Sequence, residues 1–279
     1  MKRYAIIGHP VSHSLSPFLH TTAFNALGLD CSYEAIEIAP EDLATSIRNL
    51  MDEGIAGFNV TVPHKETIIP LIDDLDEAAR SVGAVNTVLN TKGKFTGTNT
   101  DVYGFNRLAE PYADAIAGNQ VAVLGAGGAA RAVLYALTTG FGPGRITLFN
   151  RTIDRAERLA SEFSTEKILI NSESLFQEDL QKLVESSSVV INTTSVGMKP
   201  YTDASPLDDV EFREGQIVID LVYSPRETKL LKSAKDAGAT AVSGFDMLLH
   251  QAAGAFRIWT GREMPMDTVR KVLEMESQV

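Results

Sequence analysis

The chain has 279 residues, of which 44% are hydrophobic and 22% are charged, and its single cysteine, Cys31, has no partner within the chain for a disulfide. This composition is typical of a globular protein, and the length favours two domains. The net charge of −11 and the lack of a Lys/Arg block argue against a nucleic-acid partner. No apolar run reaches the ~18 residues of a membrane span, the N-terminus lacks a signal-peptide core, and no Cys/His cluster has zinc spacing. We expect a cytoplasmic protein without a metal site.

Strand-like and helix-like patterns alternate along the chain. The predicted strands are residues 3–7, 32–38, 56–60, 120–124, 145–149, 189–192, 217–220 and 239–243, with a hairpin over 85–99 that turns at Lys92-Gly93. The predicted helices include residues 16–28, 42–53, 63–69, 101–117, 129–140, 244–260 and 266–275. Ser16 is predicted as the N-cap of its helix, with Pro17 in the first turn. Strands separated by helices indicate an α/β fold with parallel sheets, and a first domain boundary is expected near Asp101.

The most specific local signal is a glycine loop between a strand and a helix. An apolar strand ends in Gly125-Ala126-Gly127-Gly128-Ala129, with Ala130 at the third position of the G-x-G-x-x-G pattern. The glycines allow a tight turn and let the backbone approach a pyrophosphate, which the positive end of a helix attracts. The alternative is a flexible loop without a ligand, but the strand–turn–helix context favours a dinucleotide site.

The end of the following strand indicates which dinucleotide binds. An NAD site usually has an acidic residue at this point for the ribose hydroxyls. Here the chain reads Asn150-Arg151-Thr152, with Arg155 three residues later. Arginine at the start of a helix opposes the helix dipole, so a bound 2'-phosphate explains the choice. The alternative is a solvated first turn in which Asp154 offsets the arginines. We favour NADP.

Polar side chains also follow the strands of the first domain. Ser14 and Ser16 stand at a helix start, Asn59, Thr61 and Lys65 follow a buried strand, and Asn86 and Asp101 end two later apolar runs. Open α/β sheets bind ligands at the carboxyl ends of their strands. Taken singly, each residue has a common structural explanation: helix capping for the serines, solvation for Lys65, and turns for Asn and Asp.

Taken together and in order, these segments resemble the shikimate dehydrogenases over nearly the whole chain. The matching motifs are Ser14-x-Ser16-Pro17, Asn59-Val60-Thr61-Val62-Pro63-His64-Lys65, Gly83-Ala84-Val85-Asn86-Thr87, Thr98-Asn99-Thr100-Asp101, the glycine loop, Asn150-Arg151-Thr152, the run from Asn192 to Met198, Asp220-x-x-Tyr223 and Gly244-x-x-Met247-x-x-x-Gln251. Each motif is weak alone, but the ordered set is specific.

The resemblance implies an NADP-dependent oxidoreductase that reversibly reduces 3-dehydroshikimate to shikimate in aromatic amino-acid biosynthesis. It implies a substrate domain with a mainly parallel sheet (1–101 plus 244–279), a Rossmann domain that binds NADP (102–243), and an active-site cleft between them. The protein is expected to be a monomer or a homodimer.

The resemblance also assigns roles to single residues. Lys65 is expected to act as acid/base with Asp101 as its partner, because an ammonium both stabilises a developing alkoxide and delivers a proton. The substrate carboxylate is assigned to Ser14, Ser16 and Tyr223, and the ring hydroxyls to Thr61, Asn86, Asp101 and Gln251, with Asn59 close by. The cofactor is assigned to Gly125, Ala126, Gly127, Gly128, Ala129, Asn150, Arg151, Thr152, Arg155, Thr194, Leu221, Gly244, Met247 and Glu77.

Two alternative functions remain open. A quinate/shikimate dehydrogenase that uses NAD differs at few positions, although Arg151 and the serine pair favour NADP and shikimate. A non-catalytic sensor on the same fold would keep the pocket and lose the lysine, so the presence of Lys65 and Asp101 favours an enzyme. A dinucleotide-binding scaffold without a substrate leaves the serine pair, Asn86 and Gln251 unexplained.

Overall fold

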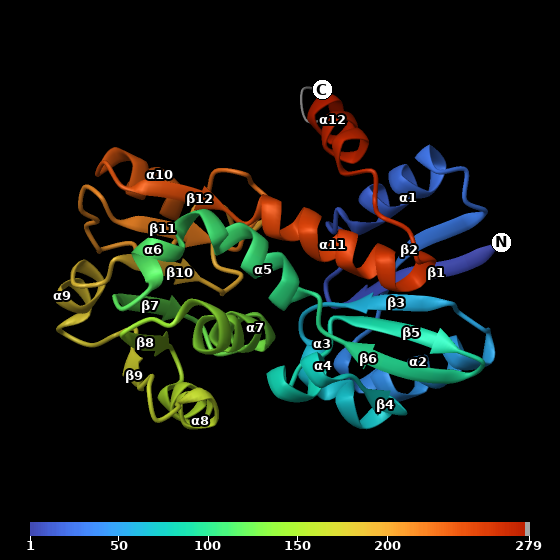
Figure 1. Ribbon diagram of the computed structural model, residues 1–279, viewed down its shortest axis with the longest axis horizontal. Coiled ribbons are helices and arrows are strands. Elements are labelled where there is room, and N and C mark those ends of the chain that lie inside the picture. Colours follow the sequence, from blue (N-terminus) through green and yellow to red (C-terminus); the bar gives the residue numbers. More distant parts are fainter. Residues whose placement is uncertain (277–279) are drawn as a thin grey trace. The chain divides into compact units, whose positions relative to one another are not determined.

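The computed structural model describes residues 1–276, with side chains through Leu273, and contains two compact units. Unit 1 consists of Met1–Gly104 and the chain from Leu249 onward, and unit 2 is Phe105–Leu248. Each unit is built on its own six-stranded sheet (Figure 1). The two boundaries between the units fall within helices. The first lies three residues after the expected boundary at 101/102, and the second lies five residues after the expected boundary at 243/244.

The sheet of unit 1 mixes parallel and antiparallel strands in the order β2-β1-β3-β5-β6-β4. Its strands are β1 (Lys2–Gly8), β2 (Cys31–Glu37), β3 (Gly57–Val60), β4 (Asp74–Leu75), β5 (Thr87–Thr91) and β6 (Lys94–Thr98). The pairs β1/β2, β1/β3 and β4/β6 are parallel, so the sheet is mainly parallel as predicted. The hairpin turns at Lys92 and Gly93, both with positive φ, which suits the twist of the antiparallel pair.

Apolar residues cover both faces of the unit 1 sheet. Its helices are α1 (Ser16–Ala26), α2 (Leu43–Asp52), α3 (His64–Thr67), α4 (Glu77–Val82), α12 (Met266–Glu276) and most of α11 (Phe245–Thr260). On one face, Ile7, Phe58 and Phe95 join a core cluster with residues of α2. The other face carries an aromatic cluster, which we define as Tyr4, His20, Phe24, Tyr33, Phe256 and Trp259.

The sheet of unit 2 is entirely parallel, in the order β12-β11-β10-β7-β8-β9. Its strands are β7 (Gln120–Leu124), β8 (Arg145–Asn150), β9 (Ile170–Ser174), β10 (Val189–Asn192), β11 (Ile217–Asp220) and β12 (Thr240–Ser243). The chain moves outward from β7 to β9, returns to β10 beside β7, and then continues to β12. This order defines a Rossmann fold, whose topological switch point lies between β7 and β10.

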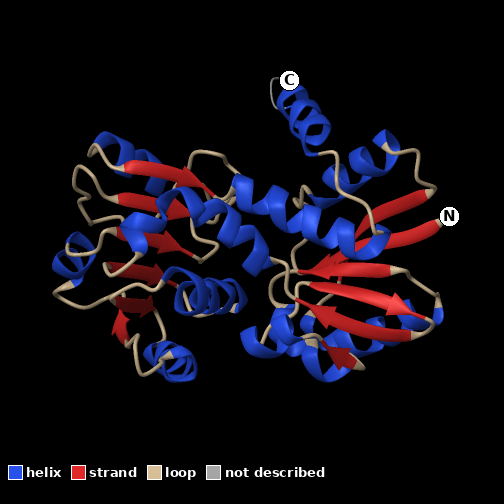
Figure 2. Cartoon of the chain, in the orientation of Figure 1, coloured by secondary structure: helices blue, strands red, loops and turns tan. Residues whose placement is uncertain are grey.

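Helices flank the strands of unit 2 (Figure 2). They are α6 (Ala113–Ile116), α7 (Gly128–Ala136), α8 (Ile153–Phe163), α9 (Leu180–Glu185), α10 (Lys229–Asp236) and most of α5 (Asp101–Ala109). Successive β7 residues Val121 to Leu124 point to opposite faces, and none of them is exposed, so both faces are covered. Within the described residues, no helix combines the length and apolarity needed to cross a membrane.

The structure corrects several expectations about local structure. Leu15, not Ser16, is the N-cap of α1, and Ser16 is the first helical residue, so Pro17 takes the second position. The helix predicted over 101–117 is interrupted after Ala109, where Pro111 removes a helical donor. The helix predicted to begin at Pro63 is divided in the same way near Pro70. The α-helix predicted over 129–140 ends at Ala136 and continues as a π-helical turn to Phe141.

Candidate active site

The residues expected to carry the chemistry gather at one edge of the unit 1 sheet. Lys65 lies in α3, just after β3, and Asp101 begins α5, just after β6. The Lys65 Nζ donates to Asp101 Oδ2 at 2.5 Å, and the two side chains are only 15% and 7% exposed. The structure therefore rules out the alternative that Lys65 is a solvated surface lysine. A charge-assisted bond of this kind fixes the position of the ammonium.

Both oxygens of the Asp101 carboxylate are bound. Asn86, just before β5, donates from Nδ2 to Asp101 Oδ1 at 2.8 Å and to Thr100 Oγ1 at 3.0 Å. The backbone N–H of Thr100 donates to Asn86 Oδ1 at 2.7 Å, and that of Asp101 donates to Asn99 Oδ1 at 3.0 Å. The carboxylate is thus fixed by Asn86 on one side and presents its other oxygen to Lys65.

Asn59 lies in β3, the strand next to β5, and its side chain helps to hold Asn86 in place. Its side chain is buried, and Nδ2 donates to the Asn86 carbonyl at 3.1 Å and to Thr87 Oγ1 at 3.0 Å. Its Oδ1 accepts from the hydroxyl of Tyr33 at 2.6 Å. Because both amide hydrogens of Asn59 are engaged within the protein, Asn59 acts as a support for Asn86.

Ser14, Ser16 and Thr61 lie where the parallel strands β1 and β3 end. The backbone N–H of Ser16 donates to Ser14 Oγ at 3.2 Å, and that of His9 donates to the Val62 carbonyl at 2.9 Å. A Cβ on Gly8 would stand 2.4 Å from Cγ2 of Thr61, so the two segments approach this closely only because residue 8 is glycine. The start of the loop that leads from β1 to the serine pair therefore lies beside the segment that leads from β3 to Lys65.

Gln251 belongs to α11 and is half-buried. Gly254, three residues later, packs so closely on Thr100 that a Cβ there would lie 3.3 Å from the threonine side chain. Residues three apart share a helix face, so Gln251 stands on the face of α11 that packs against Thr100, next to Asp101. Tyr223, the remaining residue expected to bind substrate, lies in unit 2 after β11.

The glycine loop of unit 2 follows β7 at the switch point. Gly125 has φ +103, and a Cβ there would lie 2.8 Å from Thr193 Oγ1 and 2.9 Å from Thr194 Cγ2, so the segment after β10 packs directly against it. Gly127 is the N-cap of α7, and a Cβ built on it meets nothing within 4 Å. The start of α7 thus has the open, glycine-lined backbone on which a pyrophosphate binds.

Two exposed arginines stand at the end of β8. Arg151 and Arg155 flank Thr152, the N-cap of α8, and Asn150 Nδ2 donates to the Thr152 carbonyl at 2.8 Å. Within the described residues, neither arginine forms an ion pair with Asp154 or with another carboxylate. Two guanidinium groups, one just before α8 and one in its first turn, fit a doubly charged phosphate.

A second group of polar residues orders the ends of β10 and β11. The buried Asp220 accepts from Asn192 Nδ2 at 2.8 Å, from Thr228 Oγ1 at 2.6 Å and from the Val222 N–H at 3.0 Å. Burial raises the pKa of Asp220 to about 6, although these donors lower it. Asn192 Oδ1 accepts from the backbone N–H of Thr194 at 3.0 Å and from its hydroxyl at 2.7 Å. Asp220 and Asn192 thereby hold the segment that contains Thr194.

Leu221 and Gly244 approach each other just after β11 and β12. A Cβ on Gly244 would lie 2.5 Å from the Leu221 carbonyl oxygen, so this approach requires glycine. Met247, buried in the first turn of α11, follows directly. Glu77 differs from the other expected cofactor residues because it lies in unit 1, exposed at the start of α4. Glu77 is therefore not placed beside the other expected cofactor residues within either unit.

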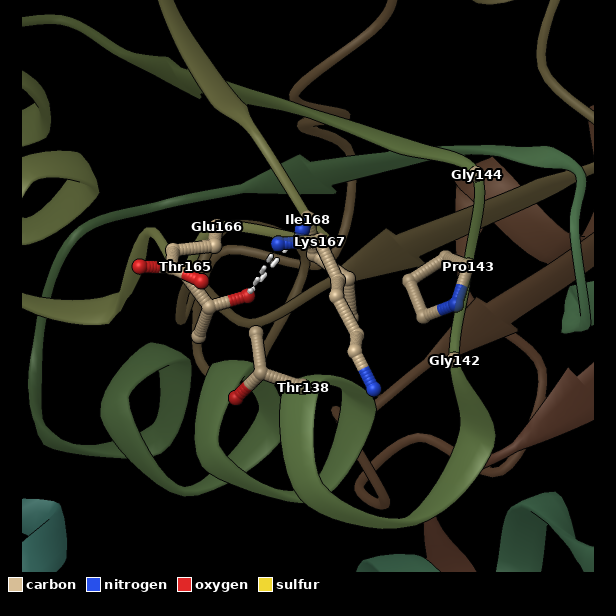
Figure 3. Close-up of a pocket in the computed structure, with 8 residues that line it drawn as sticks. All are labelled: Thr138, Gly142, Pro143, Gly144, Thr165, Glu166, Lys167 and Ile168. Carbon is tan, nitrogen blue, oxygen red and sulfur yellow. Dashed lines mark hydrogen bonds between the residues drawn. The ribbon is translucent and has the colours of Figure 1, made fainter.

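Unit 2 also has a hollow of about 720 Å³, whose lining is drawn in Figure 3. It lies away from the carboxyl ends of the strands, where the expected cofactor residues stand. Its lining residues are Thr138, Gly142, Pro143, Gly144, Thr165, Glu166, Lys167 and Ile168. They precede β8 and β9, whereas the glycine loop follows β7, so the hollow lies at the opposite edge of the parallel sheet. Among the described residues, no group of three His, Cys, Asp or Glu side chains is placed to bind a metal ion.

Sequence reasoning gave no role to the residues that support the two clusters, although its motifs contain Thr87, Thr100, Asn192 and Asp220. Tyr33, Thr87 and Thr100 support Asn86, and Asn192 and Asp220 support Thr194. Asn192 and Asp220 are polar residues that end apolar strands, which was the available signal. Tyr33 gives no such signal, because an aromatic residue in a strand is ordinary core.

Three family models match the chain in sequence order. They are the shikimate dehydrogenase substrate binding domain at residues 6–88, shikimate/quinate 5-dehydrogenase at 107–237, and the shikimate 5'-dehydrogenase C-terminal domain at 244–274. Together they span most of both units.

Individual relatives match over almost the full length. A shikimate dehydrogenase (NADP(+)) from Methanopyrus kandleri is 45% identical, over 96% of this chain and 93% of its own length. The shikimate 5-dehydrogenase of Thermus thermophilus, solved with NADP(H) and shikimate, is 36% identical with a TM-score of 0.82, covering 97% and 98% of the two chains. That of Listeria monocytogenes, solved with shikimate and NAD, is 35% identical with a TM-score of 0.85, covering 98% and 96%. This chain belongs to the shikimate dehydrogenase family.

Proposed function

We propose that this protein catalyses the reversible reduction of 3-dehydroshikimate to shikimate with NADPH, with Lys65 as the acid/base and Asp101 as its partner. The observation that carries the proposal is the nearly buried Lys65–Asp101 pair, 2.5 Å apart, at the sheet edge where Ser14, Thr61 and Asn86 also lie. Neither a structural lysine nor a scaffold protein needs a carboxylate that is fixed on both oxygens beside an ammonium.

The chemistry divides between the coenzyme and the protein. Bound NADPH would supply a hydride to the carbonyl carbon of the substrate, which would leave negative charge on the carbonyl oxygen. The Lys65 ammonium stabilises this charge and transfers a proton to the oxygen, which completes the secondary alcohol. In the oxidation direction, neutral Lys65 accepts the hydroxyl proton. Asp101 keeps Nζ in place, because its other oxygen is bound to Asn86.

The substrate is proposed to bind at the edge of the unit 1 sheet. Ser14 and Ser16 would donate to its carboxylate, together with Tyr223 of unit 2. Thr61, Asn86, Asp101 and Gln251 would bind the ring hydroxyls. Three lines of support come from the fold: the close approach at Gly8, the bonds of Asn86, and the packing of Gly254 on Thr100. A fourth is the match to a substrate-binding domain model. Asn59 is assigned a supporting role.

The cofactor residues are proposed to lie along the carboxyl edge of the unit 2 sheet. Residues 125–129 would hold the pyrophosphate, and Thr194, Leu221, Gly244 and Met247 would flank the nicotinamide, with Glu77 as a further contact. Asn150, Arg151, Thr152 and Arg155 would hold the 2'-phosphate, which NAD lacks. The unpaired arginines favour NADP, and the Listeria monocytogenes relative solved with NAD makes NAD the alternative to test.

The proposed setting is the cytoplasm, where both the coenzyme and the substrate are metabolites, with the protein as a monomer or a homodimer. The net charge of −11 supports the absence of a nucleic-acid partner. Light scattering after size-exclusion chromatography measures the oligomeric state, and a mass of twice 30.2 kDa identifies the homodimer.

The deciding experiment follows nicotinamide absorbance with the purified protein. Shikimate with NADP+ is expected to turn over rapidly, and NAD+ and quinate are then substituted one at a time. Equal efficiency with NAD+ or quinate would replace the proposal with a quinate/shikimate dehydrogenase. Binding of NADP+ without turnover of either substrate would favour the sensor.

A further inference from the structure

We propose that Tyr33 is a positioning residue for the reaction: its hydroxyl fixes Asn59 and, through Thr87 and Asn86, sets the carboxylate of Asp101 against Lys65. Tyr33 lies in β2, which β1 and β3 separate from the hairpin that leads to Asp101. The inference rests on the proposed function, because it assigns Tyr33 a role in aligning the acid/base pair.

A continuous series of hydrogen bonds connects Tyr33 to Asp101. Tyr33 donates to Asn59 Oδ1 at 2.6 Å, and Asn59 Nδ2 donates to Thr87 Oγ1 at 3.0 Å. The Thr87 hydroxyl donates to Asn86 Oδ1 at 3.0 Å, and Asn86 Nδ2 donates to Asp101 Oδ1 at 2.8 Å. Every donor points toward the carboxylate. Bonds aligned in this way polarise one another, so each is stronger than it would be alone.

Backbone groups force the direction of the series. The Asn86 carbonyl only accepts, so Asn59 must turn its amide nitrogen toward it and its oxygen toward Tyr33. The Thr100 backbone N–H only donates, so Asn86 must turn its oxygen there and its nitrogen toward Asp101. If the Tyr33 hydroxyl is removed, Asn59 Oδ1 loses its short hydrogen bond. The side-chain amide of Asn59 is then held by two contacts, those of its Nδ2.

The Tyr33 ring is fixed by packing in the aromatic cluster. It stacks on His20 with centroids 4.5 Å apart and planes 8° apart, and its centroid is 6.0 Å from that of Trp259. Trp259 is itself anchored by its indole N–H, which donates to the Val88 carbonyl at 3.0 Å. Replacement of Tyr33 by Phe keeps the ring and these contacts, so it removes the hydroxyl and little else.

The first test compares Tyr33→Phe with Tyr4→Phe. Tyr4 is a matched control, because it is a buried tyrosine of the same cluster, and among the described residues its hydroxyl bonds only to the Trp259 carbonyl, at 3.5 Å. We expect Tyr33→Phe to lower kcat for shikimate oxidation at least about threefold with an unchanged KM for NADP+, and Tyr4→Phe to leave both unchanged. A smaller fall in kcat, or an equal fall in Tyr4→Phe, overturns the proposal, because a purely structural tyrosine affects melting rather than turnover.

The second test breaks the series in the middle. Thr87→Val removes the relaying hydroxyl and is expected to lower kcat, whereas Thr87→Ser keeps the hydroxyl and is expected to retain it. Because the two residues act on one series, the double variant Tyr33→Phe/Thr87→Val should be no slower than the slower single variant. A loss equal to the product of the two single losses would contradict a shared series.

The third test does not depend on turnover. In a crystal structure of Tyr33→Phe, we expect the Asn59 amide to be rotated and Asp101 Oδ2 to lie farther from Lys65 Nζ than in the wild type. Unchanged positions of Asn59, Asn86 and Asp101 overturn the proposal. If the wild type fails to oxidise shikimate with NADP+, the proposed function is wrong, and this crystallographic comparison still decides whether Tyr33 positions the pair.

Discussion

Asn192 Nδ2 lies 2.8 Å from Asp220 Oδ1, at the ends of the adjacent strands β10 and β11. This buried bond ties together the two segments proposed to border the nicotinamide. The carboxylate accepts three hydrogen bonds, yet burial raises its pKa to about 6, so the ionised form is costly in the folded protein.

Asp220 is therefore expected to make the folded state more stable in acid. Its pKa is higher in the folded protein than the unfolded value of 3.8, so the stabilisation is complete below pH ~4 and is lost as the pH rises through about 6. The two-unit difference corresponds to about 3 kcal/mol in the free energy of unfolding. Urea unfolding of Asp220→Asn from pH 4 to 7 should lack this loss. An unchanged pH dependence in the variant would contradict the assignment.

His20 is expected to have the opposite effect. Its ring is fully buried, neither nitrogen has a hydrogen-bond partner among the described residues, and burial lowers its pKa to about 3. Its contribution to stability is complete above pH ~6.5 and decreases by about 1.4 kcal/mol per unit as the pH falls toward 3. His20→Phe keeps an aromatic ring in the cluster and removes this dependence. In the wild type the two effects oppose each other between pH 4 and 6, so His20→Phe should expose the Asp220 dependence in the same urea series.

Loss of the ammonium should affect turnover rather than coenzyme binding. Lys65→Ala is expected to lower kcat about 10²- to 10⁴-fold, because the alkoxide loses both its stabilising charge and its proton donor. The KM for NADP+ should change little. Lys94→Ala is the control, since Lys94 is an exposed lysine at the start of β6. Near-normal turnover of Lys65→Ala by nicotinamide absorbance would disprove the acid/base role.

The arginines after β8 should discriminate between the two coenzymes. Arg151→Ala and Arg155→Ala are each expected to raise the KM for NADP+ about 10- to 100-fold, the effect of losing a charged hydrogen bond, and to leave the KM for NAD+ nearly unchanged. Arg158→Ala is a control on the same helix, because its Nε donates to the Asp154 carbonyl at 3.2 Å. Equal effects on both coenzymes would remove the argument for a 2'-phosphate site.

The sequence predicts those features that depend on local patterns. The hairpin at Lys92-Gly93 and the strand–glycine–helix unit at Gly125 follow from turn chemistry and apolar runs, and both are confirmed. Strand β9 was missed because its sequence, Ile-Asn-Ser-Glu-Ser, is polar. It forms because it pairs with β8 at the edge of the sheet. Tertiary pairing overrode weak propensity there.

The supporting residues of the site could not be predicted for a related reason. The roles of Tyr33 and Thr87 depend on which strands become neighbours. Asn59 and Thr87 share a register position across β3 and β5, which no local pattern reveals. Sequence motifs identified the residues that were expected to meet ligands, whereas the hydrogen bonds behind them required the fold.

The discontinuity of unit 1 affects the order in which the protein can fold as it is synthesised. Trp259, the only tryptophan, binds the carbonyl of a residue that leaves the ribosome 171 positions earlier. While unit 2 is translated, the cluster of Tyr4, Phe24 and Tyr33 therefore lacks Phe256 and Trp259, which cover one side of it in the folded protein. Unit 2 is contiguous and can fold during that interval, and unit 1 is completed last. Tryptophan fluorescence then reports the docking of α11 on this cluster, an event that follows the translation of unit 2.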